Sequence, residues 1–192
     1  MRLGLLMFFC LWCFSCGTNS QEKQIQNLIG KTLLLPSHTR CVQAGVEWQD
    51  NALDKEYKIV TYLDPSSCSE CALQILRAWK KLLDDFSSEE AQRVGFLCLA
   101  NAARMSVSDS ILARLQIPIS VYYDLTDHFI QDNELYIDAK YRTFLIDHDN
   151  RILLVGEPLG RPKLWELYKS TIARLAANGG TLPETKKETD VE

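Results

Sequence analysis

The sequence predicts an α/β protein with a central mixed sheet of about five strands flanked by helices. Short apolar runs alternate along the chain with longer stretches in which apolar residues recur at helical spacing. Some of the short runs are apolar on both faces, as strands buried inside a sheet are. About 150 residues carry this pattern without repeats, low-complexity tracts or an interior linker, which indicates one domain with its own core.

The first part of the domain contains two predicted strands and an irregular stretch between them. Residues 31–35 (KTLLL) form a short strand. Residues 37–55 are polar and irregular, although Val46 and Trp48 are expected to pack onto the core. Residues 57–63 (YKIVTYL) form a strand with apolar residues on both faces, which predicts a place in the centre of the sheet.

An amphipathic helix is predicted directly after this strand, over residues 68–86. Its apolar side chains recur every three or four residues and therefore share one face. Ser66 or Ser67 is positioned to cap the first turn. The shared face carries Leu73, Leu76, Trp79, Leu83 and Phe86. We expect this face to cover the sheet, with Trp79, and Trp165 later in the chain, as core anchors.

The remaining elements continue the alternation. A β-hairpin is predicted where two apolar runs flank the turn residues His148, Asp149 and Asn150. Pro162 in the first turn and glycines just past the end delimit a final helix. The predicted strands cover residues 93–100, 119–123, 143–147 and 151–155, and the predicted helices cover 106–115 and 162–177, with a short segment at 127–133.

The N-terminus indicates an export signal. Met1-Arg2 precedes an uncharged apolar stretch of about a dozen residues, where a bilayer span needs about 20. The stretch ends in Cys13-Phe14-Ser15-Cys16-Gly17, which resembles the lipobox of bacterial lipoproteins. This resemblance implies that Cys16 is lipidated and that the protein is anchored in the cell envelope, facing the periplasm. Ordinary secretory cleavage and an uncleaved anchor are the alternatives.

The expected organisation follows from this signal. Residues 1–15 are the signal peptide, residues 16–30 a tether, and residues 31–178 the folded domain. Residues 179–192 are charged and poor in apolar side chains, so they are expected to be disordered.

A C-x-x-C motif, Cys68-Ser69-Glu70-Cys71, lies between the central strand and the amphipathic helix. At a helix N-terminus, unpaired N–H groups and the helix dipole favour a thiolate at the first sulfur. The second sulfur is close enough to resolve a mixed disulfide, so the motif predicts a redox dithiol. Zinc sites share this spacing, but they need a second Cys pair or a His pair. His38, His128 and His148 show no such spacing.

The five other cysteines have separate expected roles. Cys10 and Cys13 leave with the signal peptide, and Cys16 takes the lipid. Cys98 lies in an apolar strand and is expected to be a buried, unreactive thiol. Cys41 lies in a polar stretch, which leaves both the free and the paired state open. An exported chain meets an oxidising compartment, where the dithiol can cycle through a disulfide.

The order of elements and a second motif give a resemblance to a known family. Strand, C-x-x-C, helix, strand, helix, strand, hairpin, helix is the order of the thioredoxin fold. Residues 141–152 (YRTFLIDHDNRI) resemble the Pro-Thr-Thr-Phe-Leu-Ile-Asp-x-x-Gly-x-Ile signature of TlpA/ResA-type thiol–disulfide oxidoreductases. The resemblance covers residues 31–175 and is to the small thioredoxin-like lipoproteins of Bacteroidetes in particular. It implies a thioredoxin-like fold and thiol–disulfide exchange.

The chain departs from this family beside the dithiol. The family's cis-proline, which faces the dithiol, aligns with Tyr141, and the next position is Arg142. A cis peptide before a residue other than proline costs about 3–4 kcal/mol, so this connection is expected to be trans. Docking of partners by main-chain pairing is therefore in question. Ser67 and Glu70 replace the family's Trp and Pro before the first and second cysteine.

The motif has a defined chemistry under the oxidoreductase hypothesis. Cys68 attacks a partner disulfide, and Cys71 resolves the mixed disulfide. Asp64 and Glu70 oppose the helix N-terminus, because a carboxylate beside a thiolate raises the thiol pKa. Arg142 would offset them if its side chain turned toward the pair. With these acids opposing the helix N-terminus, we expect the Cys68–Cys71 pair to be more reducing than the dithiol of a strong oxidase.

Two other functions fit the same motif. In the first, the two cysteines form a permanent disulfide in a non-catalytic binding module. In the second, less favoured, they bind copper together with His128 or His148, as in Sco-like proteins. A peroxidatic cysteine would need a Pro-x-x-x-Thr/Ser-x-x-Cys context, whereas Pro65 lies only three residues before Cys68.

Composition limits the partners. The chain has 21 basic and 25 acidic residues and a net charge of −4, with no basic patch, which argues against nucleic acid. It has no Gly-rich phosphate loop and no H-E-x-x-H motif. The expected partners are exported proteins with thiols or disulfides, and a membrane through the lipid anchor. No cofactor and no metal are expected.

Overall fold

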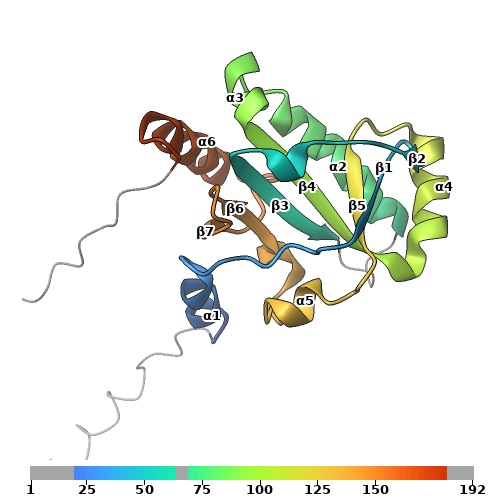
Figure 1. Cartoon of the computed structure of the whole chain (residues 1–192), viewed down its shortest axis with the longest axis horizontal. Coiled ribbons are helices and arrows are strands. Elements are labelled where there is room, and N and C mark those ends of the chain that lie inside the picture. Colours follow the sequence, from blue (N-terminus) through green and yellow to red (C-terminus); the bar gives the residue numbers. More distant parts are fainter. Residues whose placement is uncertain (1–19, 64–68, 181–192) are drawn as a thin grey trace, which may run out of the picture.

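The computed structural model describes residues 20–63 and 69–180, apart from the side chains of residues 20, 21, 69–72 and 104. Seven strands form one mixed sheet in the order β2-β1-β5-β4-β3-β6-β7 (Figure 1). The strands are β1 (Thr39–Gln43), β2 (Val46–Glu47), β3 (Tyr57–Leu63), β4 (Val94–Asn101), β5 (Ser120–Asp124), β6 (Thr143–Ile146) and β7 (Ile152–Val155).

Six α-helices and three 3-10 turns accompany the sheet in the described residues. The helices are α1 (Ser20–Leu28), α2 (Ser69–Leu83), α3 (Ser88–Arg93), α4 (Met105–Leu115), α5 (Phe129–Asp132) and α6 (Pro162–Ala177). The turns are η1 (Ala52–Asp54), η2 (Ala102–Arg104) and η3 (Ala139–Tyr141). The predicted α/β class, with a mixed sheet flanked by helices, is confirmed.

Three parallel strands, β3, β4 and β5, form the centre of the sheet. They are joined by α2 and α4, and so all three end at one edge, which we call the carboxyl edge. β6 runs antiparallel to β3, and β7 antiparallel to β6, which confirms the predicted hairpin. β1 runs antiparallel to β5 on the other side.

The sheet has more strands than predicted because β1 and β2 form within the stretch expected to be irregular. Their two-residue turn is Ala44-Gly45, and both residues have positive φ (49° and 80°), the conformation that a tight hairpin favours. A Cβ at Gly45 would meet the backbone of Asp109 in α4, so this turn needs glycine. Val46 and Trp48 were expected to pack onto the core, and this is wrong: they are 61% and 52% exposed.

The short strand predicted over residues 31–35 is not a regular strand. The segment instead runs along the start of β7 through one isolated bridge between Thr32 and Arg151. The Ile152 N–H donates to the Lys31 carbonyl (2.8 Å), and the Leu33 N–H donates to the Asn150 carbonyl (2.8 Å). The pairing does not continue to Leu34, whose backbone N–H and carbonyl are bonded to the side-chain amide of Asn133 instead (2.7 and 2.9 Å).

The side chains of the sheet divide into two clusters on its two faces. Ile59 and Cys98 join one cluster, whereas their neighbours Val60 and Leu97 join the other, as alternation along a strand requires. The first face is covered by α2, α4 and α6, and we call it the helix-covered face. The second is covered by α1, α5, η1 and extended segments, and we call it the loop-covered face.

The segment expected as a tether contains α1. Its last residue, Leu28, is buried in the cluster on the loop-covered face, while most of the helix is exposed. Within residues 20–63 and 69–180, no helix has the length and apolar character needed to cross a bilayer.

Candidate functional site

The described part of the C-x-x-C motif, the backbone of residues 69–71, begins α2 at the carboxyl edge. β3 ends at Leu63 and α2 begins at Ser69, so the backbone of Glu70 and Cys71 lies in the first turn of a 15-residue helix. Leu73, Leu76 and Trp79 fix this helix to the sheet, because all three are buried in the helix-covered face. The helix N-terminus is thereby held at the end of the central strand.

Several predicted site residues lie outside the described part of the chain. These are Asp64 and Cys68, together with the side chains of Glu70 and Cys71. Cys16, the predicted lipidation site, also lies outside it.

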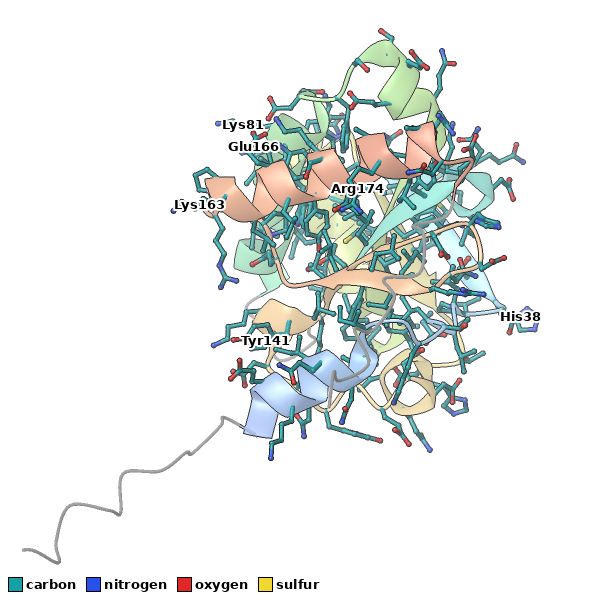
Figure 2. The ribbon with its side chains drawn as sticks, turned by 90° about the vertical axis from the view of Figure 1, so that its left-hand side faces the viewer. His38, Lys81, Tyr141, Lys163, Glu166 and Arg174 are labelled. Atoms are coloured by element: carbon teal, nitrogen blue, oxygen red, sulfur yellow. The ribbon has the colours of Figure 1, made fainter. Side chains whose placement is uncertain are left out.

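Tyr141 and Arg142 lie beside the end of β3. The Tyr62 N–H donates to the Arg142 carbonyl (3.0 Å), which extends the β3–β6 pairing by one residue. One step further in, the hydroxyl groups of Thr61 and Thr143 are 2.9 Å apart in a buried pair. The connection that carries Tyr141, which is labelled in Figure 2, is therefore fixed to the strand that leads into the motif.

The geometry of this connection follows from η3. The Arg142 N–H donates to the Ala139 carbonyl (3.0 Å), and the Arg142 Nε donates to the Ile137 carbonyl (3.0 Å). Tyr141 is half-buried, with the Lys140 Nζ 4.9 Å from the centre of its ring. The peptide bonds of the described residues, including those of this connection, are trans.

Glu157 also lies at this edge, and the sequence analysis missed it. The Gly156 N–H donates to the Thr143 carbonyl (2.8 Å), and the Glu157 N–H donates to the Lys140 carbonyl (3.1 Å). Glu157 is half-buried, and burial raises the pKa of its carboxyl group, against the smaller opposing effect of Arg161. The available signal was an acid two residues after the end of the predicted strand 151–155.

The two described cysteines outside the motif are both free. Cys98 is fully buried in β4, and burial strongly raises the pKa of its thiol, which confirms the prediction of an unreactive group. Cys41 is half-buried in β1, opposite Tyr122 of β5. Burial raises the pKa of the Cys41 thiol as well.

The histidines differ in their distance from the motif. His148 lies in the turn between β6 and β7, at the opposite edge of the sheet, because β6 runs from Thr143 beside Thr61 to Ile146 beside Lys58. His128 follows β5 at the carboxyl edge and is exposed. Among the side chains that the structure describes, no group of three or more His, Cys, Asp or Glu is placed to hold a metal ion.

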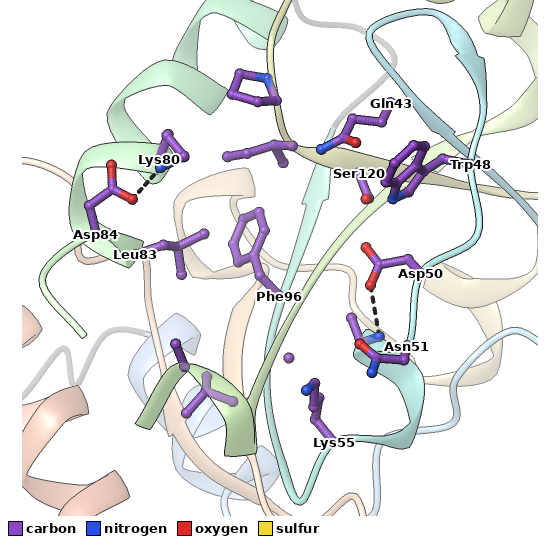
Figure 3. Close-up of a pocket in the computed structure, with 16 residues that line it drawn as sticks. Gln43, Trp48, Asp50, Asn51, Lys55, Lys80, Leu83, Asp84, Phe96 and Ser120 are labelled. Carbon is purple, nitrogen blue, oxygen red and sulfur yellow. Dashed lines mark hydrogen bonds and ion pairs between the residues drawn. The ribbon is translucent and has the colours of Figure 1, made fainter. Parts of the chain in front are cut away.

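An open cavity of about 360 Å³ lies at the edge opposite the motif. Trp48, Asp50 and Ser120 form one wall, and Leu83 with the Lys80–Asp84 ion pair faces them from α2 (Figure 3). The side chains on both walls already have partners or face solvent. The full length of the central strands separates this cavity from the carboxyl edge.

The topology and the position of the motif define an α/β protein of the thioredoxin-like class. No protein-family model matches the sequence, and no curated protein matches it. A solved structure of PrxQ from Xylella fastidiosa is 19% identical and aligns with a TM-score of 0.50, over 79% of this chain and 96% of that one. At this identity the likeness shows the fold, which is thioredoxin-like.

Two structures from other bacteria are also similar. A thioredoxin-like protein from Bacteroides caccae is 17% identical, with a TM-score of 0.44 over 79% of this chain. This chain spans only about half of that protein, 53% of its length. A thioredoxin-like protein from Porphyromonas gingivalis is 13% identical, with a TM-score of 0.46 over 74% of this chain and 94% of that one.

Proposed function

We propose that this chain is a membrane-tethered thiol–disulfide oxidoreductase that acts on exported proteins through Cys68 and Cys71. The main support for this proposal is the position of α2 in the sheet. The helix starts directly after the central strand of a thioredoxin-like sheet, and Cys71 lies in its first turn. Two thiols at such a helix N-terminus are placed for exchange, because the N-terminus favours a thiolate.

The exchange proceeds in two steps. The Cys68 thiolate attacks one sulfur of a partner disulfide and forms a mixed disulfide, and the other partner sulfur leaves as a thiolate. The Cys71 sulfur then attacks Cys68, which forms the Cys68–Cys71 disulfide and releases the second partner sulfur. The partner is reduced by two electrons and the C-x-x-C pair is oxidised. A second protein dithiol restores the reduced pair by the reverse steps.

A redox titration tests this function. The full chain is equilibrated in thiol buffers, trapped by alkylation and read by peptide mass. We expect a reversible couple between about −120 and −270 mV. A matched variant, Cys41→Ser, should leave the couple unchanged, whereas Cys68→Ser abolishes it. A pair that stays oxidised below about −300 mV would overturn the proposal.

The second candidate is a non-catalytic binding module, and one observation favours it. The position that the family fills with a cis-proline is Tyr141, in a trans connection whose Arg142 carbonyl is already bonded to Tyr62. A partner strand would have to share that carbonyl with the Tyr62 N–H. The permanently oxidised pair in the titration above is the result that this candidate requires.

The tether is a separate part of the proposal. It is supported by the apolar N-terminal stretch and the lipobox-like sequence that ends in Cys16 and Gly17. We expect the full chain to fractionate with membranes and to carry a mass increase of a lipid on Cys16. The Cys16→Ser variant should lose both, and an unchanged membrane fraction in that variant would contradict lipid anchoring.

A further inference from the structure

We propose that the cavity at the edge opposite the motif binds a small zwitterion with an apolar side chain, the chemistry that a free amino acid and a dipeptide share. The cavity has a volume of about 360 Å³, which lies in the size range of small-molecule sites. It is divided into a polar wall and an apolar wall, as sites for amphipathic ligands are (Figure 3). This role is separate from thiol–disulfide exchange and goes beyond the proposed function.

The polar wall carries two opposite charges, the Asp50 carboxylate and the Lys55 ammonium. The two residues lie on either side of η1, and both side chains line the cavity (Figure 3). Asp50 Oδ1 accepts the Ala52 N–H (3.0 Å), and the Lys55 Nζ donates to the Gln92 carbonyl (2.7 Å). A carboxylate accepts several hydrogen bonds and an ammonium donates more than one, so both groups keep capacity for a ligand.

The other charged residues that line the cavity neutralise each other. Lys80 and Asp84 form an ion pair along α2, on the opposite wall (Figure 3). The charges open to a ligand are therefore one anion and one cation, both on the polar wall. In the proposed complex the ligand ammonium faces Asp50 and the ligand carboxylate faces Lys55, and each contact is a charge-assisted hydrogen bond. A ligand with a single charge would satisfy only one of the two groups.

The apolar wall faces these charges across the cavity. It is lined by Leu83 of α2, Phe96 of β4 and Ile119, which precedes β5. The Phe96 ring packs against buried Trp79, with ring centres 4.8 Å apart, and this contact holds it at the wall. An apolar ligand side chain placed here leaves water, which favours leucine or phenylalanine over a polar residue. Trp48 forms the rim, and the ligand covers part of its exposed indole.

The polar wall is held in place by contacts at two points. Ala52 is buried, and a Cβ at Gly95 of β4 would lie 2.2 Å from the Ala52 carbonyl, so η1 packs directly on the sheet. Before this turn, the Trp48 N–H donates to the Cys41 carbonyl of β1 (3.1 Å). Asp50 lies between these two points. Because the wall is already ordered, little free energy is lost in arranging it around a ligand.

Two hydroxyl groups lie at the Asp50 end of the cavity. Ser120 is 7% exposed, and its side chain lines the cavity beside Asp50 (Figure 3). Tyr122 follows two residues later on the same face of β5, and its buried hydroxyl has no hydrogen-bond partner among the described residues. Asp50 is close enough to help raise the pKa of Tyr122, after the larger effect of burial. Buried polar groups are ordinarily bonded, so this unpaired hydroxyl indicates a network that a further polar group completes.

Isothermal titration calorimetry of the full chain with leucine and with leucyl-leucine tests the site. We expect at least one of the two to bind with a Kd of roughly 0.1–1 mM, as suits a small ligand with few contacts. The tighter of the two identifies the ligand as an amino acid or a peptide. Its N-acetyl form, which lacks the ammonium, and its C-terminal amide, which lacks the carboxylate, should each bind about 10-fold more weakly.

Two charge variants locate the ligand, each with a matched control. Asp50→Asn keeps an oxygen for the Ala52 N–H but removes the charge, and it should weaken binding about 10-fold. Acetylation of the ligand should then cost nothing further. Asp54→Asn, an exposed acid on η1 that does not line the cavity, should leave binding unchanged. Lys55→Met should also weaken binding about 10-fold, whereas Lys81→Met, exposed on α2, should not. Circular dichroism confirms that the variants are folded.

Three results would overturn the proposal. The first is that neither ligand binds at concentrations about 10-fold above the expected Kd range. The second is equal affinity for the free and the acetylated ligand, and the third is an equal loss in Asp50→Asn and Asp54→Asn. None of these results bears on Cys68 and Cys71, whose role is tested separately by the redox titration.

Discussion

The two faces of the sheet are built in different ways. The helix-covered face is closed by three helices of 11–16 residues, each with a stripe of apolar side chains. The loop-covered face is closed by short pieces that contribute few buried residues each, such as Leu28 of α1, Ala52 of η1 and Phe129 of α5. A periodic stripe is visible in a sequence, whereas single buried residues in separate segments are not.

The two faces also differ in the polar groups that they bury. On the loop-covered side, Lys58 and Asp124 are almost fully buried, and Lys58 reaches Asn150 Oδ1 at 3.3 Å. On the helix-covered side, the polar contacts include the Thr61–Thr143 hydroxyl pair and the Tyr168 hydroxyl, which donates to the Gly156 carbonyl. Asp124 accepts the N–H groups of Thr126 and Phe129, so this buried carboxylate satisfies the backbone of the short segment that follows β5.

The largest effect should come from the centre of the helix-covered face. Trp79 is fully buried and packs against Phe96 in a tilted arrangement, with ring centres 4.8 Å apart. Trp79→Ala should cost about 3–5 kcal/mol of unfolding free energy, measured by denaturant titration. Trp48→Ala, at a half-exposed site, should stay within about 0.5 kcal/mol. Equal losses in the two variants would contradict the difference in packing.

The next largest effect should come from the loop-covered face at Gly95. A Cβ at this position would collide with the carbonyl of Ala52 in η1, and backbone cannot move aside as a side chain can. Gly95→Ala should cost about 3 kcal/mol, at the upper end of the usual range for overpacking. Hydrogen exchange should rise first in η1 and leave α6 protected. Simultaneous loss of protection in both elements would show that the two faces are not independent.

A smaller effect, dependent on pH, is expected at Asp124. Burial tends to raise the pKa of this carboxyl, but hydrogen bonds from Thr126 and from the Phe129 N–H (3.0 Å) outweigh it and lower the pKa. The carboxylate therefore stabilises the fold above the pKa of the unfolded chain, and this contribution is lost as the pH falls through the lower folded value.

Asp124→Asn should accordingly cost about 2 kcal/mol at pH 7, in line with hydrogen bonds to a charged group. The difference from the wild type should shrink in acid, below the ordinary aspartate value of 3.8. Denaturation at pH 7 and pH 3 measures it, with Asp132→Asn at an exposed site as the control. A difference that is the same at both pH values would exclude a role for the charge.

The smallest effect is expected at the polar pair of the helix-covered face. Thr143→Val keeps the shape but leaves the Thr61 hydroxyl without its partner, which should cost about 1 kcal/mol. The double variant Thr61→Val/Thr143→Val should recover part of this loss, because no unpaired group remains. Strictly additive losses in denaturant titrations would mean that the pair contributes no coupling.

The sequence predicted the helix-covered face well and the loop-covered face poorly. The final helix was predicted with the bounds that α6 has, because Pro162 and the glycines past its end are local signals. β1 gave no such signal, although its one buried residue, Val42, belongs to the helix-covered face, because its pairing depends on the distant strand β5. η1 and α1 likewise owe their positions to contacts with distant strands.

The candidate site shows the same division. Cys68 and Cys71 were recognisable because their spacing and their place before a helix are local features. Tyr141 and Arg142 were singled out through the resemblance of the hairpin motif, and the Arg142 carbonyl is bonded to Tyr62 near the end of β3. Glu157 was missed because its position depends on hydrogen bonds to Lys140 and on burial beside α6.

The position of β1 has a consequence for how the chain folds as it is made. Thr39 of β1 pairs with Asp124 of β5, and Lys31 is bonded to Ile152. Ribosomes deliver about 5–20 residues per second, so β1 waits roughly 5–15 s for its partner strand. Until then β1 and β2 form only an isolated hairpin, which is marginal in water. The N-terminal quarter of the protein is thus made first and joins the sheet late.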